Sequence, residues 1–256
     1  MAIYWMYRKK GLIPAVVILG LDPWLLNKNN GQVRYESIAR EYNEITGYIL
    51  GQNNGKNEVP FFLPAKYFEL ISPSYFQSSF WFWLKGLNEK KPEQGRFYPT
   101  SKIMGNEDIK LADGSISYGL KQRSVNASEL RLSAMRFANA NSVYSIDNFT
   151  RLDPRLEDKF DKFINLMLKD KVKVIFFLPS YHPAAYPILI GSDKYRIIVD
   201  VQSYFEKYAN CKKIKILGSY SARDCSLSGA DFYDAMHIKK KAINMMFKQI
   251  VHNSKR

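Results

Sequence analysis

Three short runs of consecutive apolar residues stand out along the chain, each rich in valine, isoleucine or phenylalanine. They are PAVVILGLDPW at 14–24, KVKVIFFLPS at 171–180 and KKIKILGSYS at 212–221. A run of this kind, bounded by Gly, Pro or polar residues, is typical of a strand that is buried on both faces of a parallel sheet. The pattern therefore predicts three strands, and we expect the first of them to be covered on both sides.

Helices are predicted where apolar residues recur every three or four positions. The segments with this spacing are 3–10, 153–170, 193–209 and the stretch that begins at Ile238. Gly11 is a stop signal for the first segment, and Asp153 with Pro154 is a start signal for the second. Strands that alternate with helices predict an α/β fold with a doubly wound parallel sheet.

The interval 28–150 is too long for one strand–helix–strand unit, so we expect a mostly helical insertion within a single domain spanning 1–256. Helices are expected near 35–48, 65–71, 75–87 and 127–140. Asp113 and Gly114 predict the turn of a hairpin. Aromatic residues crowd 61–84. This favours a helical core packed under the sheet over a membrane-surface or glycan-binding face.

Ligand and catalytic sites of doubly wound sheets form at the carboxyl ends of the strands. Three loops of this chain are expected at that edge, namely 22–27, 179–183 and 219–237. The polar side chains in these loops that have candidate roles are Asp22, Asn27, Ser180, His182, Ser219, Asp234 and His237. The convergence of this chemistry on one edge favours a functional site there.

Asp234 and His237 form the most informative pair, because an aspartate precedes a histidine by three residues. A histidine is the usual general base near neutral pH, and it needs a partner that fixes its tautomer and stabilises the imidazolium. On one helical turn the two side chains would lie on the same side. The alternative is that Asp231 and Asp234 are the acidic first turn of the helix that follows.

The segment DFYDAMHIK, at 231–239, resembles the C-terminal end of the SGNH (GDSL-like) hydrolases. In that family an Asp-x-x-His supplies two members of a Ser-His-Asp triad on a flavodoxin-like, three-layer sheet. The segment VVILGLDPWLLN, at 16–27, is similar to the Gly-x-Asp-Pro block of a divergent, envelope-associated branch. The resemblance covers these two blocks and the strand pattern between them. It implies an esterase or O-acyltransferase that acts on ester-linked acyl groups of cell-envelope glycans.

Two departures from the family pattern change what the resemblance implies. The family has an asparagine that donates to the oxyanion where this chain has Asp22, and a carboxylate cannot donate unless it is protonated. Asn27 is a candidate replacement, or Asp22 is structural. The family's nucleophilic serine follows its first strand, and the first strand here corresponds to its third. We therefore expect an N-terminally truncated fold, inactive as it stands, with an exposed sheet edge.

Other side chains near the expected site leave further alternatives open. Ser219 follows a strand and a glycine, and Ser180 precedes a histidine by two residues, but neither occupies the family's nucleophile position. His182 is either a substrate contact or a satisfied loop histidine. With Asp22, Asp231, Asp234 and His237 it also makes a minor candidate metal cluster. No metal site and no cofactor is predicted.

The composition limits the partners that the chain is expected to have. Lys and Arg number 38 against 24 for Asp and Glu, a net charge of +14, but the sequence has no zinc-finger, bZIP or RNP-like pattern. We expect an acylated glycan or a small ester as substrate, weak and non-specific attachment to nucleic acid, and peripheral contact with a membrane or envelope surface. A non-catalytic module that binds a glycan or membrane surface is the alternative function. Neither the compartment nor the oligomeric state follows from the sequence.

The N-terminal segment MAIYWMYRKKGLIP does not have the order of charged and apolar residues that a signal peptide has. No apolar run in the sequence approaches the ~20 residues of a membrane span. A location in the cell envelope is implied only by the family resemblance.

Overall fold

The computed structural model describes residues 1–31, 36–51, 108–110, 116–140 and 145–253. The chain divides into two compact units, the first made of Met1–Asn53 and Leu120–Arg256 and the second of Asn54–Gly119. The second unit lies inside the insertion expected over 28–150 but has narrower boundaries. The expectation of a single domain over 1–256 stays a prediction.

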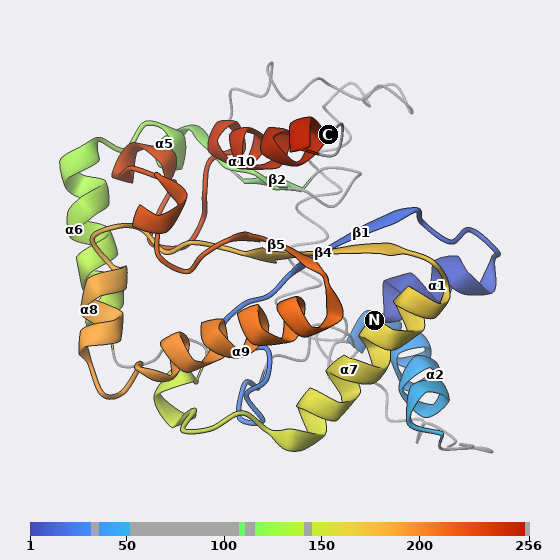
Figure 1. Ribbon diagram of the computed structural model, residues 1–256. Helices are drawn as coiled ribbons and strands as arrows, with labels where there is room; N and C mark the ends of the chain where they lie inside the picture. The colour runs from blue at the N-terminus through green and yellow to red at the C-terminus, as the bar shows by residue number, and fades with distance from the viewer. Residues whose placement is uncertain (32–35, 52–107, 111–115, 141–144, 254–256) are drawn as a thin grey trace, which may run out of the picture. The chain divides into compact units, whose positions relative to one another are not determined.

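The first unit is built on a three-stranded parallel sheet (Figure 1). The strands, in the order in which they pair, are β1 (Val16–Gly20), β4 (Lys173–Leu178) and β5 (Lys215–Gly218). Ile18 pairs with Ile175, and Phe176 pairs with Ile216. Each of the three predicted apolar runs forms one strand, so the mixed α/β class and the parallel sheet are confirmed.

Helices cover both faces of this sheet, as Figure 1 shows. Helices α7 (Pro154–Lys169) and α9 (Ile197–Lys212) lie on one face, and α10 (Lys240–Asn253) lies on the other. Successive side chains of β4 point to opposite faces. Phe176 therefore meets Phe160 of α7 at 5.7 Å between ring centroids. Phe177 meets Phe247 of α10 at 5.4 Å.

Strand β1 departs from the expectation that it is buried on both faces. The side chains of Val16 and Ile18 are 47 % and 48 % exposed. Val17 and Leu19 are half-buried and pack against the main core. The apolar cluster beneath α10 reaches Phe177 of β4 and, in the described part of the chain, includes no residue of β1. An apolar run cannot separate a central strand from an edge strand with one covered face, because valine and isoleucine suit both.

The remaining elements are α1 (Ala2–Lys9), η1 (Glu36–Ile38), α2 (Ala39–Leu50), α5 (Leu120–Arg123), α6 (Ala127–Ala138), η3 (Ile146–Asn148), α8 (Tyr186–Gly191), η4 (Arg223–Cys225) and η5 (Gly229–Asp231). Among them, α1, α2 and α6 lie close to the helices expected at 3–10, 35–48 and 127–140, while the other short helices are not among the predicted elements. Asp153 caps α7 by accepting the N–H groups of Arg155 and Leu156. The helices expected near 65–71 and 75–87 lie outside the described residues.

In the second unit, the antiparallel pairing of the expected hairpin is present. Strand β2 (Ile109–Lys110) pairs with β3 (Ile116–Ser117), with Lys110 opposite Ile116. The predicted turn at Asp113 and Gly114 lies outside the described residues.

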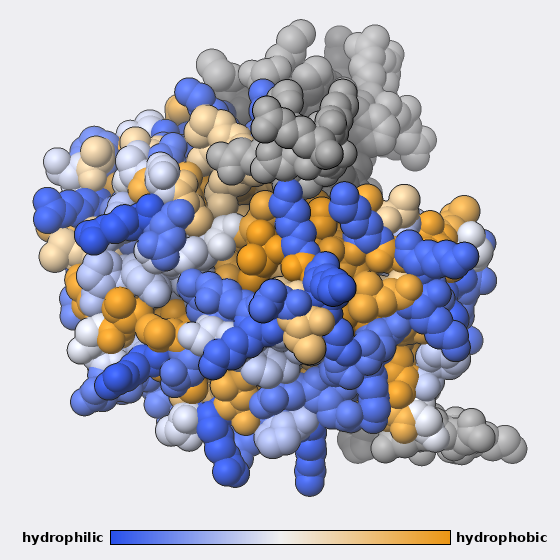
Figure 2. Space-filling view, in the orientation of Figure 1, coloured by the Kyte–Doolittle hydropathy of each residue, from blue (hydrophilic) through white to orange (hydrophobic). Residues whose placement is uncertain are grey.

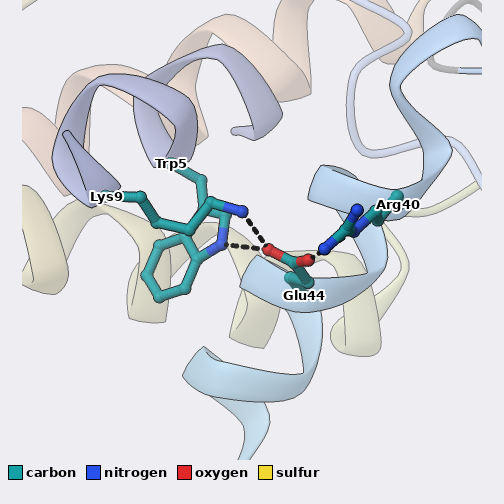
Figure 3. A network of polar contacts seen from close by, with 4 residues as sticks. All are labelled: Trp5, Lys9, Arg40 and Glu44. Atoms are coloured by element: carbon teal, nitrogen blue, oxygen red, sulfur yellow. Dashed lines mark hydrogen bonds and ion pairs between the residues drawn. The ribbon is translucent and has the colours of Figure 1, made fainter. Parts of the chain in front are cut away.

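Helix α1 is fixed against α2 by a polar network centred on Glu44 (Figure 3). The Glu44 carboxylate accepts hydrogen bonds from the Trp5 indole at 3.0 Å and the Lys9 ammonium at 2.5 Å, and Arg40 reaches its other oxygen at 3.0 Å. The hydrogen bond from Lys9 is the main reason that the pKa of Glu44 falls to about 2. The side of α1 that carries Trp5 and Lys9 is thereby held against α2.

Gly218 is a position at which we expect substitution to be costly. It ends β5 at a φ of +77°, and a Cβ built on it would lie 2.3 Å from the backbone oxygen of Leu178. We expect Gly218→Ala to lower the free energy of unfolding by more than about 2 kcal/mol, measured by urea denaturation. Gly20 ends β1 with open space around it, so Gly20→Ala is the matched control, with a change below about 1 kcal/mol. Equal effects of the two substitutions would contradict the expectation that the close approach of Gly218 to the Leu178 backbone makes substitution costly.

Candidate active site

Asp234 and His237 are in direct contact. The Nδ1 atom of His237 lies 2.7 Å from Oδ2 of Asp234. Both side chains reach solvent, with 51 % of the histidine and 41 % of the aspartate exposed. The structure thus brings together the two residues that the sequence singled out, and it leaves the imidazole accessible to a reacting molecule.

The contact arises from a turn and not from the helical turn that we expected. Residues 233–236 form a bend between η5 and α10. Oδ1 of Asp234 accepts the backbone N–H groups of Met236 at 2.8 Å and His237 at 2.9 Å, as aspartates in turns commonly do. The N–H of Tyr233 donates to the His237 carbonyl at 2.8 Å and closes the loop. The carboxylate therefore organises the backbone that presents the imidazole.

The acidic-first-turn explanation of this stretch is wrong. Helix α10 begins at Lys240, and its first turn contains no acidic residue. Asp231 belongs to the earlier helix η5, where its side chain and that of Ser228 form a capping box. Neither aspartate of the motif serves the N-terminus of α10, so the close contact of Asp234 with the histidine is its main side-chain interaction.

The electrostatics of the pair are those of a base held by a carboxylate. The hydrogen bond to Asp234 raises the pKa of His237, burial opposes the rise, and the negative charges of Asp234 and Asp22 add to it. Burial would raise the pKa of Asp234, but the hydrogen bonds from His237 and the backbone outweigh it and lower that pKa. The pair therefore favours an imidazolium beside an ionised carboxylate.

His182 is a buried residue that contacts the loop carrying Asp234 and His237. Its side chain is 3 % exposed, and its backbone N–H donates to the carbonyl of Ala235 at 2.8 Å. Its Nδ1 accepts the N–H of Ala184 at 3.1 Å, and its ring meets Phe232 edge-on at 5.4 Å. Burial and the positive charge of Arg131 lower its pKa. Of the two alternatives for this residue, the satisfied loop histidine is the one that the structure supports.

Ser180 and Ser219 are buried and hydrogen-bonded within the loops that follow β4 and β5. The hydroxyl of Ser180 donates to the Ser219 carbonyl at 2.6 Å. The hydroxyl of Ser219 lies 3.0 Å from Oδ2 of Asp224 and accepts the N–H of Ser221 at 3.1 Å. Their exposed fractions are 1 % and 6 %. These bonds tie the two loops together and give both serines a structural role.

Asn27 is also a structural residue. It is 3 % exposed, its side-chain amide donates to the carbonyl of Ser145 at 2.9 Å, and its Oδ1 accepts the N–H of Asn29 at 2.9 Å. The loop after β1 is thus fastened to the segment that precedes α7. The expectation that Asn27 replaces an oxyanion donor finds no support in this geometry.

Asp22 follows β1 at the edge where the His237 loop lies. The N–H of Leu21 donates to the Phe177 carbonyl at 2.9 Å, so the backbone continues along β4 up to Asp22. The charge of Asp22 contributes to the raised pKa of His237. At this position the negative charge of the carboxylate favours the protonated imidazole, an effect that the neutral amide of an asparagine would lack.

Tyr220 holds this edge together, and sequence reasoning missed it. Its side chain is fully buried, and its hydroxyl donates to the Leu21 carbonyl at 2.8 Å, which joins the end of β5 to the end of β1 across β4. Its backbone N–H donates to Oε1 of Gln202 at 3.0 Å. A lone tyrosine after a strand gives no sequence signal for such a bridge.

The candidate metal cluster does not form in the described part of the chain, where no group of three or more His, Cys, Asp or Glu side chains is placed to hold an ion. Asp231 is engaged with Ser228, and Nδ1 of His182 already accepts a backbone N–H. Asp231 and His182 are therefore occupied elsewhere, and Asp234 and His237 contact each other.

Comparisons with known proteins add little to this description. No protein-family model matches the chain, and no curated protein matches it. Among solved structures, a chain from Bacteroides fragilis described as "a putative acylhydrolase" is 16 % identical, with a TM-score of 0.30. The match covers 52 % of this chain and 72 % of that chain.

The pKa values of His237 and His182 are expected to be shifted in opposite directions. In a proton NMR titration, His237 should have a pKa above the ordinary 6.5 and His182 a pKa below it. Asp234→Asn should lower the pKa of His237, while Asp231→Asn, its matched control, should leave it unchanged. A raised folded-state pKa means that the protonated pair stabilises the fold below about pH 6.5, and that this stability is lost as the pH rises through the folded pKa. An unchanged pKa in Asp234→Asn would contradict the assignment.

Proposed function

We propose that this chain carries the base of an ester-hydrolysing or acyl-transferring site, with His237 as general base and Asp234 as the residue that orients it. The observation that carries the proposal is the 2.7 Å contact between Nδ1 of His237 and Asp234 at the carboxyl edge of a parallel sheet. The resemblance of DFYDAMHIK to the SGNH hydrolases supports the reaction class. It also suggests the substrate, ester-linked acyl groups of cell-envelope glycans.

The proposed chemistry follows from which nitrogen is used. Because Nδ1 faces Asp234, Nε2 is the nitrogen that would take a proton from an attacking hydroxyl as its oxygen bonds to the ester carbonyl. The same nitrogen then returns the proton to the departing alkoxide. Asp234 stays ionised and stabilises the imidazolium between these steps, which fits its lowered pKa. Binding of this carboxylate to two backbone N–H groups keeps the ring in place throughout.

The attacking hydroxyl is proposed to come from neither Ser180 nor Ser219. Each is buried and engaged in hydrogen bonds within its loop. A nucleophilic serine must instead lie within hydrogen-bond reach of its base, about 2.6–3.2 Å. The sequence predicts an inactive chain because the family's nucleophilic serine is missing, and we propose instead that water or another hydroxyl is the partner that His237 would activate.

Hydrolysis of p-nitrophenyl acetate tests the role of the pair. We expect His237→Ala to lower the rate by about 10²–10⁴-fold, and Asp234→Asn to lower it by a comparable factor, because a correctly oriented base is lost. Asp231→Asn, in the same stretch, is the control and should keep the parent rate. Ser180→Ala and Ser219→Ala should also retain activity in protein that remains folded by circular dichroism. Equal rates in the parent and His237→Ala would remove His237 from the chemistry.

Asp22→Asn separates two roles for the carboxylate at the end of β1. If Asp22 acts on the imidazolium, its loss lowers the pKa of His237, and the rising limb of the pH–rate profile moves to lower pH. If position 22 instead lines an oxyanion site, the amide supplies a donor and the maximum rate increases. We expect the shift of the limb without an increase in the maximum rate. An increased maximum with an unmoved limb would contradict this.

A further inference from the structure

The amino ends of the three parallel strands form an edge opposite the candidate active site. The residues before β1, β4 and β5 lie next to one another there, because Val16 pairs with Lys173 and Ile175 pairs with Lys215. The N–H of Lys173 also donates to the Ala15 carbonyl at 2.9 Å. We call this edge, with the adjoining ends of α1, α7 and α9, the amino edge.

Basic residues gather at the amino edge. They are Lys10 before β1, Lys169 at the end of α7, Lys171 and Lys173 at the start of β4, and Lys213 and Lys215 at the start of β5. The acidic residues there are held in ion pairs. Asp170 pairs with Arg8 at 2.7 Å, and Asp161 pairs with Lys212 at 2.8 Å. The edge therefore presents a surplus of positive charge to its surroundings.

Exposed apolar side chains occur along α1, between α1 and the start of β1, and near the end of α7. They are Ile3, Tyr7, Leu12, Ile13, Val16 and Leu168, with exposed fractions between 37 % and 64 %. Figure 2 shows hydrophobic and hydrophilic residues interleaved on the side of the molecule where α1 and the start of β1 lie. Such a gathering on a surface marks a site of interaction with a protein or a membrane.

Helix α1 presents Ile3 and Tyr7 outward because its other side is held against the core and α2. The hydroxyl of Tyr4 donates to Asp170 at 2.6 Å, and its ring meets Phe163 of α7 at 5.8 Å. The Glu44 network holds Trp5 and Lys9 toward α2 (Figure 3). Ile3 and Tyr7 are four residues apart, and so they share one exposed side of the helix.

We propose that the amino edge docks on an anionic lipid surface. Lysines complement the charge of acidic headgroups, and short apolar side chains beside them can enter the headgroup region. A polyanion such as nucleic acid or an acidic glycan would account for the lysines but not for six exposed apolar residues beside them. In the described ranges, no helix has the length and apolar character needed to span a bilayer, so the contact is peripheral.

This orientation directs His237 away from the lipid. The amino edge and the carboxyl edge are opposite ends of the same parallel strands, and His237 lies beyond the carboxyl end of β5. A molecule docked in this way would keep its imidazole accessible to substrate in the aqueous phase. The lipid contact is independent of the proposed ester chemistry, since no residue of the Asp234 loop takes part in it.

Sedimentation with sucrose-loaded vesicles tests the proposal, with phosphatidylglycerol mixed into phosphatidylcholine and phosphatidylcholine alone as the neutral comparison. We expect binding to the anionic vesicles only. The triple variant Lys171→Glu, Lys173→Glu, Lys213→Glu should bind at least about tenfold more weakly. Its matched control reverses three exposed charges near the other edge, Lys194→Glu, Lys240→Glu and Lys241→Glu, and should bind within about twofold of the parent.

A second variant separates lipid from a soluble polyanion. Leu12→Ser with Ile13→Ser changes two exposed loop residues without changing charge, and we expect it to weaken vesicle binding several-fold while leaving binding to a heparin column unaltered. Equal losses in the two charge variants would reduce the effect to net charge and overturn the proposal. Full vesicle binding by the serine variant would overturn the lipid assignment in favour of a polyanion. Esterase activity has no bearing on either outcome.

Discussion

The carboxylate of Asp234 is the interaction on which the candidate site depends. One oxygen accepts two backbone N–H groups and thereby shapes the loop, while the other meets Nδ1 of His237. The same group that sets the backbone also orients the ring and holds its charge. Because these three tasks share one side chain, the geometry of the imidazole is fixed before any substrate arrives, which is the kind of preorganisation that general-base chemistry requires.

The loops around this pair gain their positions from the ends of the parallel strands. Tyr220 joins the end of β5 to that of β1, and Ser180 joins the loop after β4 to the loop after β5. The backbone N–H of His182 donates to the carbonyl of Ala235, which lies between Asp234 and His237 in the chain. The polar residues that gather near the histidine thus mainly connect loops, and the burial of Ser180 and Ser219 is consistent with the proposal that neither serine is the nucleophile. A concentration of polar residues at a strand end therefore indicates a site, but it does not show which of these residues take part in a reaction.

The two ends of the sheet have different surface chemistry. The carboxyl end holds an exposed histidine in contact with the Asp234 carboxylate, and the amino end mixes lysines with exposed apolar side chains. Parallel pairing separates the two ends by the length of the strands, which would allow the proposed lipid contact at one end and the proposed chemistry at the other. The excess of positive charge in the composition is, on this account, partly a localised feature of one edge.

The sequence by itself determined the three strands, the helices between them and the pairing of Asp234 with His237, because apolar period and short-range spacing are local properties. Tertiary structure decided that β1 is half exposed, that Asp234 works through a turn, and that Asn27, Ser180 and Ser219 are braces. These outcomes depend on which neighbour covers a strand or accepts a proton. Tyr220 and Leu21, whose hydrogen bond closes the site's edge, are 199 residues apart, and no local pattern encodes that contact.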